Sequence, residues 1–263
     1  MTRHHPGAAR FPFLAGPLPL AFVHRGGSGR GAENSLSAFS AAIDLGYRYL
    51  ETDVHTTSDD VAVVFHDRTL DRATDRTGRI DRLPWSQVRK ARIAGSEPIP
   101  RLDELLAAFP GLRINIDMKS PGAVPGVTRA IQRAGALDRV CVASFVDARV
   151  AAARRLLGPR LCTSLGRRGV AALRLASFSP RASALLGVRA ACAQLPMAIA
   201  GRPLVDRRLL DTAHDLGMQV HVWTLNSPAE ISFALDLGVD GIMTDAPAVL
   251  RDVLEDRGQW QSS

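Results

Sequence analysis

Long apolar segments are missing from this chain of 263 residues. No uninterrupted run reaches the roughly 20 residues that a membrane-spanning helix needs. The first twenty residues, MTRHHPGAARFPFLAGPLPL, contain four prolines and no continuous apolar stretch of the kind found in signal peptides. We therefore expect no integral membrane segment and no signal peptide, and we expect the protein in the cytoplasm.

Cysteine and lysine are also scarce. An odd number of cysteines, each inside an apolar run, favours buried free thiols over a disulfide framework; they are Cys141, Cys162 and Cys192. Lysine occurs only as Lys90 and Lys119, whereas arginine fills the other basic positions. Lys119 therefore stands out two residues after Asp117, because arginine and lysine are not equivalent where a compact charge must fit.

Aromatic residues make up only 5% of the chain, and the net charge of +7 comes from scattered arginines rather than from one basic block. Nucleic-acid binding usually needs a basic patch with interleaved aromatics or a recognisable motif, and neither is present. We therefore expect no nucleic-acid partner. A basic surface could equally attract an anionic substrate or make peripheral contact with anionic lipid. The sequence does not indicate an oligomeric state.

A repeated pattern of a short apolar strand followed by a helical segment runs along the chain. The strand candidates are Ala21–His24, Tyr49–Val54, Arg113–Met118, Val140–Ser144, Leu161–Ser164, Ala190–Gln194, Gln219–Thr224 and Gly241–Thr244. The helix candidates are Ser35–Leu45, Val124–Ala134, Asp147–Leu157, Arg167–Ala176, Asp206–Leu216 and Pro228–Leu237. Eight such units in about 250 residues predict an α/β fold, the TIM (β/α)8 barrel, which carries its site at the carboxyl ends of the strands.

One further strand candidate, Val61–Phe65, follows the second strand too closely for a parallel crossover. We therefore predict a hairpin with an antiparallel partner, which returns His66 towards the second strand. The segment 67–100 is expected to be a small insertion with a short helix at Trp85–Ala91. The predicted organisation is an arm at 1–20, a single barrel domain at 21–255 and a tail at 256–263.

Two histidines lie at the ends of apolar runs, and both are candidate catalytic residues. A lone histidine there would more often be a packed core residue, but His24 and His66 accompany an acidic cluster. Two imidazoles can act as acid and base near neutral pH. Arg25 follows His24 directly, and its guanidinium can hold phosphate. This combination is typical of phosphodiester cleavage.

Three carboxylates at strand ends are candidate metal ligands. Glu51 and Asp53 are two residues apart on one strand and therefore face the same way. Asp117 ends another apolar strand, where a buried charge needs a partner. Three such carboxylates suit one hard divalent cation, Ca²⁺ or Mg²⁺.

Three further residues at strand ends are candidates for contact with substrate. Trp223 would lie at the mouth of the barrel, where it could either cap the core or pack on an apolar part of a substrate. Phe145 and Gln194 are candidates of the same kind.

The order of these motifs resembles the glycerophosphodiester phosphodiesterase family. The resemblance runs from about Ala21 to Leu250 and rests on HRGG, ENS, ETDV, VVFHD, IPRLDELL, NIDMK, VWTLN and DGIMTDAP. It implies a TIM barrel with one divalent cation that hydrolyses glycerophosphodiesters to glycerol 3-phosphate and an alcohol. It further implies that His24 and His66 are the acid–base pair and that Arg25 and Lys119 bind phosphate.

The resemblance also assigns the metal to Glu51, Asp53 and Asp117. The third position is often glutamate in the family, whereas related sphingomyelinase-D-like enzymes have the Asp-x-Lys found here at Asp117. Two alternatives therefore stay open: a phospholipase-D-like enzyme that acts on lysophospholipids, and a non-catalytic barrel that binds phosphodiesters or anionic membranes. The sequence leaves open the preferred alcohol, the roles of the two histidines, and whether water or the glycerol 2-hydroxyl attacks first.

Overall fold

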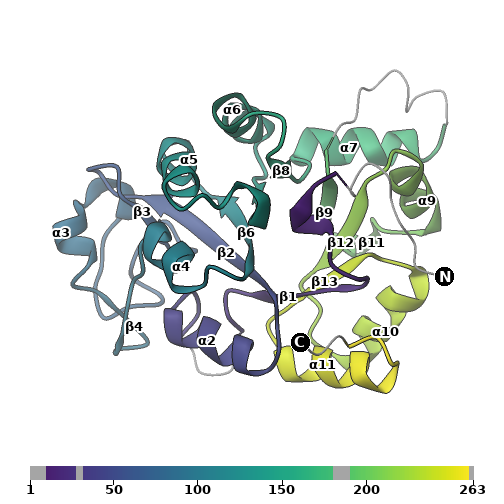
Figure 1. Cartoon of the computed structure of the whole chain (residues 1–263), viewed down its shortest axis with the longest axis horizontal. Coiled ribbons are helices and arrows are strands. Elements are labelled where there is room, and N and C mark those ends of the chain that lie inside the picture. The colour runs from purple at the N-terminus through teal and green to yellow at the C-terminus, as the bar shows by residue number, and fades with distance from the viewer. Residues whose placement is uncertain (1–9, 28–31, 180–189, 261–263) are drawn as a thin grey trace.

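Eight parallel strands form a nearly closed barrel in the computed structural model, which describes residues 10–27, 32–179 and 190–260 (Figure 1). Their order around the barrel is β8 (Cys162–Thr163), β7 (Val140–Ala143), β6 (Arg113–Met118), β2 (Tyr49–Thr56), β1 (Leu20–His24), β13 (Gly241–Thr244), β12 (Gln219–Trp223) and β9 (Cys192–Pro196). A parallel bridge between Ser164 and Cys192 links the two ends of this row. The predicted TIM barrel is confirmed.

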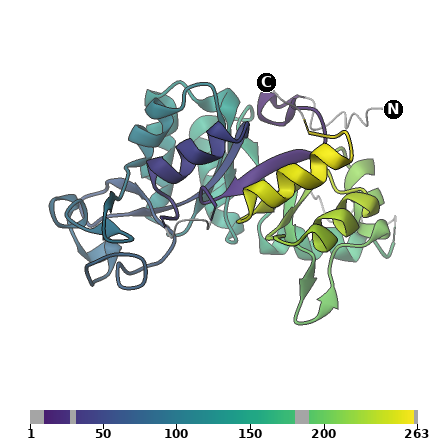
Figure 2. The ribbon, with the colours of Figure 1, turned by 90° about the horizontal axis from the view of Figure 1, so that it is seen from below.

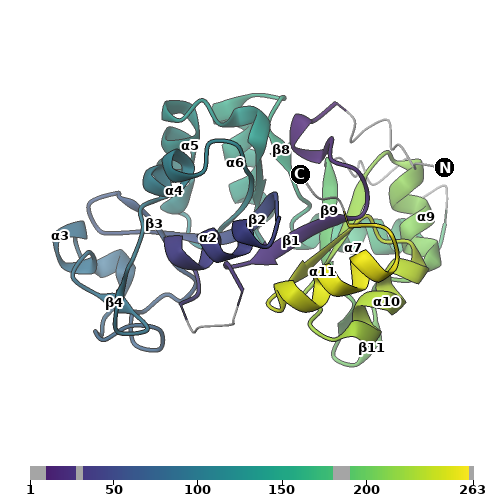
Figure 3. The same ribbon diagram turned by 60° about the horizontal axis from the view of Figure 1, so that its bottom comes forward.

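Helices pack around the strands and follow them in the chain. They are α2 (Leu36–Asp44), α4 (Leu102–Ala108), α5 (Ala123–Arg133), α6 (Asp147–Leu157), α7 (Arg167–Ala176), α9 (Arg207–Asp215), α10 (Pro228–Leu237) and α11 (Pro247–Asp256), with a 3-10 turn, η3, at Leu137–Arg139. A local signal fixes the start of α10, where Ser227 and Glu230 form a reciprocal capping box and Pro228 lies in the first turn. Figure 3 shows α2 and α11 in front of β1.

Side chains along each strand point alternately into the barrel and towards the surrounding helices. On β6, Ile114, Ile116 and Met118 join the main apolar core with residues of the surrounding helices. The intervening Asn115 and Asp117 therefore face the barrel interior, because successive strand residues point to opposite sides. The same rule brings Glu51 and Asp53 of β2 to the interior.

The end of the barrel opposite the carboxyl ends of the strands is closed by the segment before β1. Phe13 and Leu14, in the 3-10 turn η1 (Pro12–Leu14), are buried against Phe22, Tyr49 and the three cysteines. The hydroxyl of Tyr49 donates a hydrogen bond of 2.9 Å to the carbonyl of Phe13. These contacts close one end of the barrel.

The predicted hairpin is present: β3 (Ala62–Val64) pairs antiparallel with β2. After it come η2 (Ile80–Arg82), α3 (Trp85–Val88), β4 (Arg92–Ile93) and β5 (Glu97–Pro98), which protrude at one end of the molecule in Figure 1. This part has a small apolar core of its own, built around Phe65, Leu70, Ile80 and Ile93. A second hairpin, β10 (Ala198–Ile199) and β11 (Arg202–Pro203), follows β9 and projects from the ribbon in Figure 2.

The structure agrees with what the sequence indicates about the cysteines. The three cysteines are buried and free, as expected. In the part of the chain that the structure describes, no helix is both long and apolar enough to cross a membrane.

Candidate functional site

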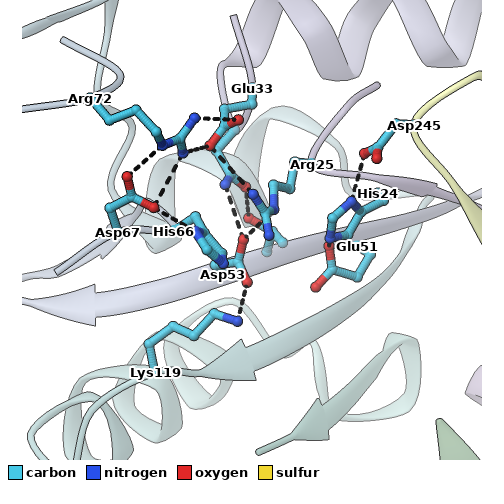
Figure 4. A network of polar contacts seen from close by, with 12 residues as sticks. His24, Arg25, Glu33, Glu51, Asp53, His66, Asp67, Arg72, Lys119 and Asp245 are labelled. Carbon is cyan, nitrogen blue, oxygen red and sulfur yellow. Dashed lines mark hydrogen bonds and ion pairs between the residues drawn. The ribbon is translucent and has the colours of Figure 1, made fainter. Parts of the chain in front are cut away.

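His24 ends β1 and meets a carboxylate from the last strand of the barrel. The parallel register pairs Val23 with Thr244, so His24 and Asp245 are neighbours at the carboxyl ends of β1 and β13. Nδ1 of His24 lies 2.6 Å from Oδ1 of Asp245 (Figure 4). A carboxylate only accepts, so Nδ1 carries the hydrogen and Nε2 is the nitrogen left for chemistry. Nε2 lies 3.7 Å from Oε2 of Glu51.

The charge around His24 favours its protonated form. Burial acts to lower the pKa of the imidazole, but the carboxylate of Glu51 and the hydrogen bond to Asp245 outweigh it, so the pKa is raised. His24 therefore holds its proton more tightly than a histidine exposed to water would.

His66 follows β3 and repeats this arrangement. Its Nδ1 lies 2.6 Å from Oδ1 of Asp67, the next residue in the chain. The ring of His55 donates from Nε2 to the carbonyl of His66 at 3.0 Å and so fixes the backbone there. Figure 4 shows His66 beside Asp53, and His24 beside Glu51. Both predicted histidines therefore present Nε2 while an aspartate occupies Nδ1.

Arg72, from the insertion, connects the His66 side of the site to the loop after β1. Its guanidinium donates to both oxygens of Asp67, at 2.6 and 3.2 Å, and to both oxygens of Glu33, at 3.2 and 2.5 Å. Two bidentate pairs fix the geometry of all three groups, because the planar guanidinium matches the carboxylate fork. The insertion thus helps to hold Asp67 against His66.

The three predicted metal carboxylates come from adjacent strands. The register of β2 and β6 pairs Asp53 with Asp117, and Glu51 lies two residues before Asp53 on the same face. All three are buried. Lys119 bridges two of them, with Nζ 2.8 Å from Oδ1 of Asp53 and 2.6 Å from Oδ2 of Asp117.

Arg25 binds the other side of Asp53, with Nε 2.9 Å from Oδ2. It adopts a positive φ of 54°, which turns the chain sharply after His24. The amide of Asn34 also donates to Oδ2 of Asp53, at 3.3 Å, and its oxygen accepts from the hydroxyl of Thr52. Asp53 is therefore surrounded by positive charge and donors.

The pKa values follow this uneven distribution. Burial opposes ionisation of Asp53, but Lys119 and Arg25 hold its pKa below the usual value. Burial and the neighbouring Asp53 raise the pKa of Glu51 to about 7. Burial also raises the pKa of Asp117, although Lys119 acts in the opposite direction. Two of the three carboxylates therefore lack enough nearby positive charge.

Two oxygens of the carboxylate cluster are available to a hard cation. Oε2 of Glu51 and Oδ1 of Asp117 are buried without a hydrogen-bond partner among the described residues. Buried carboxylate oxygens without partners are costly, and a divalent cation that binds oxygen would satisfy them. The three carboxylates do not bring their ligand oxygens within 4.8 Å of one another, since among the described residues only the three cysteines form such a group. The chemistry of the donors nevertheless fits Ca²⁺ or Mg²⁺.

Two of the predicted substrate contacts lie together. The rings of Phe145 and Trp223 meet edge to face, with centroids 5.9 Å apart. Nζ of Lys119 lies 5.9 Å from the Phe145 ring, and the Arg167 guanidinium lies 5.1 Å from it. Phe145 is 44% exposed. The pair therefore forms an apolar wall beside the charged cluster.

Gln194 is placed differently. Its amide donates to Oδ1 of Asn115 at 2.9 Å. Asn115 is two residues before Asp117 on β6 and so lies one layer deeper in the barrel. Gln194 fills the interior below the carboxylates, and its amide is committed there.

Several residues of the polar network were not predicted from the sequence as parts of the site. Asp245 is not among the residues predicted from the sequence, although closure of a barrel makes the last strand a neighbour of the first. Asp67 directly follows His66, and that adjacency was the available signal. Glu33 and Asn34 directly precede Ser35, the N-cap of α2, and polar residues are ordinary at such a position. No sequence pattern points to Arg72.

The chain is similar to known proteins over almost its whole length. Residues 24–249 match the model of the Glycerophosphoryl diester phosphodiesterase family. A Mycobacterium tuberculosis protein named probable glycerophosphodiester phosphodiesterase 2 is 40% identical over 260 residues, which cover 98% of each chain. A human lysophospholipase D is 29% identical over 271 residues, which cover 88% of this chain and 84% of its own.

A solved structure agrees over nearly the whole chain. A Silicibacter pomeroyi protein whose crystal structure is designated a glycerophosphoryl diester phosphodiesterase superposes with a TM-score of 0.79 at 27% identity. The match covers 95% of this chain and 100% of that one.

Proposed function

The chain belongs to the glycerophosphoryl diester phosphodiesterase family, and from this we propose that it hydrolyses glycerophosphodiesters to sn-glycerol 3-phosphate and an alcohol with the help of one divalent cation. The observation that carries the proposal is the pair of histidines, each with an aspartate on Nδ1, beside one buried carboxylate cluster. Family membership makes the protein a phosphoric diester hydrolase. The assignment of roles to its residues is our proposal.

The two imidazoles would move the protons of the reaction through Nε2. One removes the proton of the nucleophile as its oxygen bonds to phosphorus. The other gives a proton to the oxygen of the leaving alcohol as the bond between that oxygen and phosphorus breaks. The nucleophile is either water, or the 2-hydroxyl of the glycerol unit, in which case water opens the resulting cyclic phosphate.

Arg25 and Lys119 would bind the phosphoryl oxygens. Both now make ion pairs with Asp53, at 2.9 and 2.8 Å, so both lie where the cluster meets the barrel mouth. Fixed positive charge beside a phosphoryl group stabilises the charge that develops during the displacement. Asp53 would hold the positively charged side chains of Arg25 and Lys119 in place for this task.

Glu51, Asp53 and Asp117 would hold the divalent cation, for which we propose Ca²⁺ or Mg²⁺. When bound, the cation would supply positive charge to the phosphoryl oxygens. The unpartnered oxygens of Glu51 and Asp117 support this assignment. We also propose a cytoplasmic location, which is consistent with the three free thiols.

A phospholipase-D-like activity on lysophospholipids is the second candidate. Its support is the human relative named lysophospholipase D, together with the exposed Phe145 and Val146 next to the charged cluster. Such an enzyme would accept an acyl chain on the glycerol unit, against this apolar wall. The two candidates share the phosphate chemistry and differ in what occupies the mouth.

The direct test is a product assay with glycerophosphocholine, in which glycerol 3-phosphate and choline are both quantified. We expect equal amounts of the two products. His24→Ala and His66→Ala should each lower kcat by roughly 10²- to 10⁴-fold, the usual range for one acid–base group. His214→Gln is a matched control, because His214 lies on α9 and pairs with Asp240 instead. If neither product forms at saturating glycerophosphocholine, the result would favour a non-catalytic barrel that only binds phosphodiesters.

A further inference from the structure

Three cysteines meet inside the barrel, away from the carboxylate cluster. Cys141 of β7 pairs with Cys162 of β8, and Cys192 starts β9 beside Ser164. Their sulfur atoms all lie within 4.8 Å of one another, and all three side chains are buried. Register also pairs Cys141 with Asn115, one layer below Asp117. The group is therefore distinct from the site described above.

The spacing suits one soft cation. In a tetrahedral site with metal–sulfur bonds of about 2.3 Å, two sulfur ligands lie roughly 3.8 Å apart. The Sγ atoms of Cys141 and Cys192 are 3.9 Å apart. Thiolate sulfur prefers zinc and related soft cations, whereas Ca²⁺ and Mg²⁺ prefer oxygen. The two clusters would therefore select different metals.

A histidine beside this group has a free ring nitrogen. The Gln219 amide donates to the carbonyl of Leu14 at 3.3 Å, which fixes its orientation. Its Oε1 then lies 3.1 Å from Nε2 of His221, so that Nε2 must carry the hydrogen. Nδ1 of the fully buried His221 is left as a lone pair without a hydrogen-bond partner among the described residues.

A metal-ligating histidine commonly donates from its second nitrogen to an oxygen acceptor, as Nε2 of His221 does here. The ring is not yet in a ligand position, because the ligand atoms that lie within 4.8 Å of one another in the described part of the chain are the three sulfurs alone. The same imidazole interacts with the Cys192 thiol: hydrogen bonds from Cys141 and Cys162, together with His221, lower the pKa of Cys192 well below its usual value. Burial raises the pKa of Cys141 and of Cys162. A cation would have to displace the protons of those two thiols.

We propose that Cys141, Cys162 and Cys192 form a structural binding site for one zinc-class cation, and that His221 moves towards the three sulfurs to become the fourth ligand. Binding replaces the protons on sulfur, which are released to solvent, by three metal–sulfur bonds and one metal–nitrogen bond. The site lies behind Phe13, Leu14 and Phe22, so the cation enters while the chain folds. It would then link β7, β8, β9 and β12, including the weakly bridged junction of β8 and β9.

The experiment uses the full chain, unfolded with reductant and chelator and then refolded with one equivalent of Cd²⁺ and excess Mg²⁺. Mg²⁺ occupies oxygen ligands, and Cd²⁺ reports sulfur ligands through its charge-transfer absorption. We expect about one tightly held cadmium per chain, as in a closed site of three sulfurs and one nitrogen. The absorption should be lost in Cys162→Ala, while Asp117→Asn, which changes only the carboxylate cluster, should keep it.

Two measurements keep the test decisive if a variant folds poorly. Circular dichroism with phosphodiesterase activity checks that Cys162→Ala is folded. On the wild-type chain alone, an absence of retained cadmium means that the thiols only pack as small core residues, and this overturns the proposal. Alkylation and mass spectrometry of the protein as isolated give the thiol count. A disulfide between any two of the three cysteines would also overturn it.

Discussion

His24 and Asp245 lie 221 residues apart in the chain, yet Nδ1 of one is 2.6 Å from Oδ1 of the other. The contact exists because the barrel closes between β1 and β13, which pair in parallel register up to Val23 and Thr244. Closure of the fold thus sets the tautomer of a candidate catalytic residue. Asp67 does the same for His66 from the next position in the chain.

Asp245→Asn should therefore slow the reaction without unfolding the protein. An amide can donate to Nδ1 or accept from it, so the variant loses the fixed tautomer and the negative charge. We expect kcat to fall by at least roughly 10- to 100-fold, the cost known for partners that orient metal-ligating histidines, and by up to about 10⁴-fold, the cost known for the aspartate behind a catalytic histidine. KM should change little, because Asp245 is not among the proposed phosphate ligands.

Steady-state kinetics with glycerophosphocholine and a thermal melt measure this prediction. Asp236→Asn is a suitable control, since Asp236 pairs with Arg257 on the outside of the barrel. An unchanged kcat in Asp245→Asn would show that His24 does not depend on Asp245 for its tautomer.

Removal of divalent cations is expected to abolish turnover. Without a cation, burial and Asp53 raise the pKa of Glu51 to about 7, and Oδ1 of Asp117 has no partner in the described part of the chain. Exhaustive treatment with EDTA should reduce the rate to background, and Mg²⁺ or Ca²⁺ should restore it. Asp117→Asn should need a higher cation concentration for half-maximal rate. Full activity in the chelated protein would remove the metal from the proposed mechanism.

The sequence predicted the eight strands of the barrel well, because each is a short apolar run that ends in polar residues, whereas the two-residue strands β4, β5, β10 and β11 were not predicted. Even β8, of only two residues, falls inside the predicted range Leu161–Ser164. Helices α4 and α11 were not predicted. Helix α4 has only seven residues, and the residues that precede the two helices, Arg101 and Ala246, are not the Ser, Thr, Asp or Asn that usually marks a helix start.

The site was predictable where strand order alone determines proximity. The ends of β2 and β6 bring Asp53 and Asp117 together by register. The Arg72–Glu33 contact could not be foreseen in this way, because it depends on the path of the insertion, which its own small core determines. The position of Lys119 between two carboxylates likewise depends on side-chain conformation rather than on periodicity.

Alkaline pH should destabilise the protein through Tyr49. Burial raises the pKa of this phenol from 10 to about 12. The folded state therefore keeps a proton that the unfolded state has lost, so the contribution is complete below about pH 10 and disappears as pH rises towards 12. The other tyrosine, Tyr47, changes in the same direction.

Urea unfolding between pH 10 and 12 tests this in the wild type and in Tyr49→Phe. The variant loses the hydrogen bond to the carbonyl of Phe13 and should be less stable at pH 8 by about 1 kcal/mol. Between pH 10 and 12 the unfolding free energy of the variant should fall less steeply than that of the wild type. The two slopes should differ by roughly 1.4 kcal/mol per pH unit, which corresponds to one proton. Parallel slopes for the two proteins would contradict a raised pKa for Tyr49.

The choice of substrate should depend on the glycerol phosphate half and hardly on the alcohol. The charged groups of the site converge on Asp53 and its neighbours, whereas the apolar wall consists of Phe145 and Trp223. One aromatic pair does not form a cage for a quaternary ammonium. Glycerophosphocholine, glycerophosphoethanolamine and glycerophosphoglycerol should then have kcat/KM values within about tenfold, or roughly 1.4 kcal/mol in transition-state binding.

Lysophospholipids should react much more slowly than these three compounds, because their glycerol carries an acyl chain that a site fitted to a small polar group excludes. Phe145→Ala separates the two views of the mouth. If Phe145 only borders a small polar site, the variant should keep its kcat/KM for glycerophosphocholine within a few-fold and gain little on lysolipid. If the wild type prefers lysolipid and Phe145→Ala loses that preference selectively, the wall binds an acyl chain. In that case the enzyme is phospholipase-D-like. Asp117 and Lys119, which match the Asp-x-Lys of sphingomyelinase-D-like enzymes, would then help to explain the preference for lysolipid.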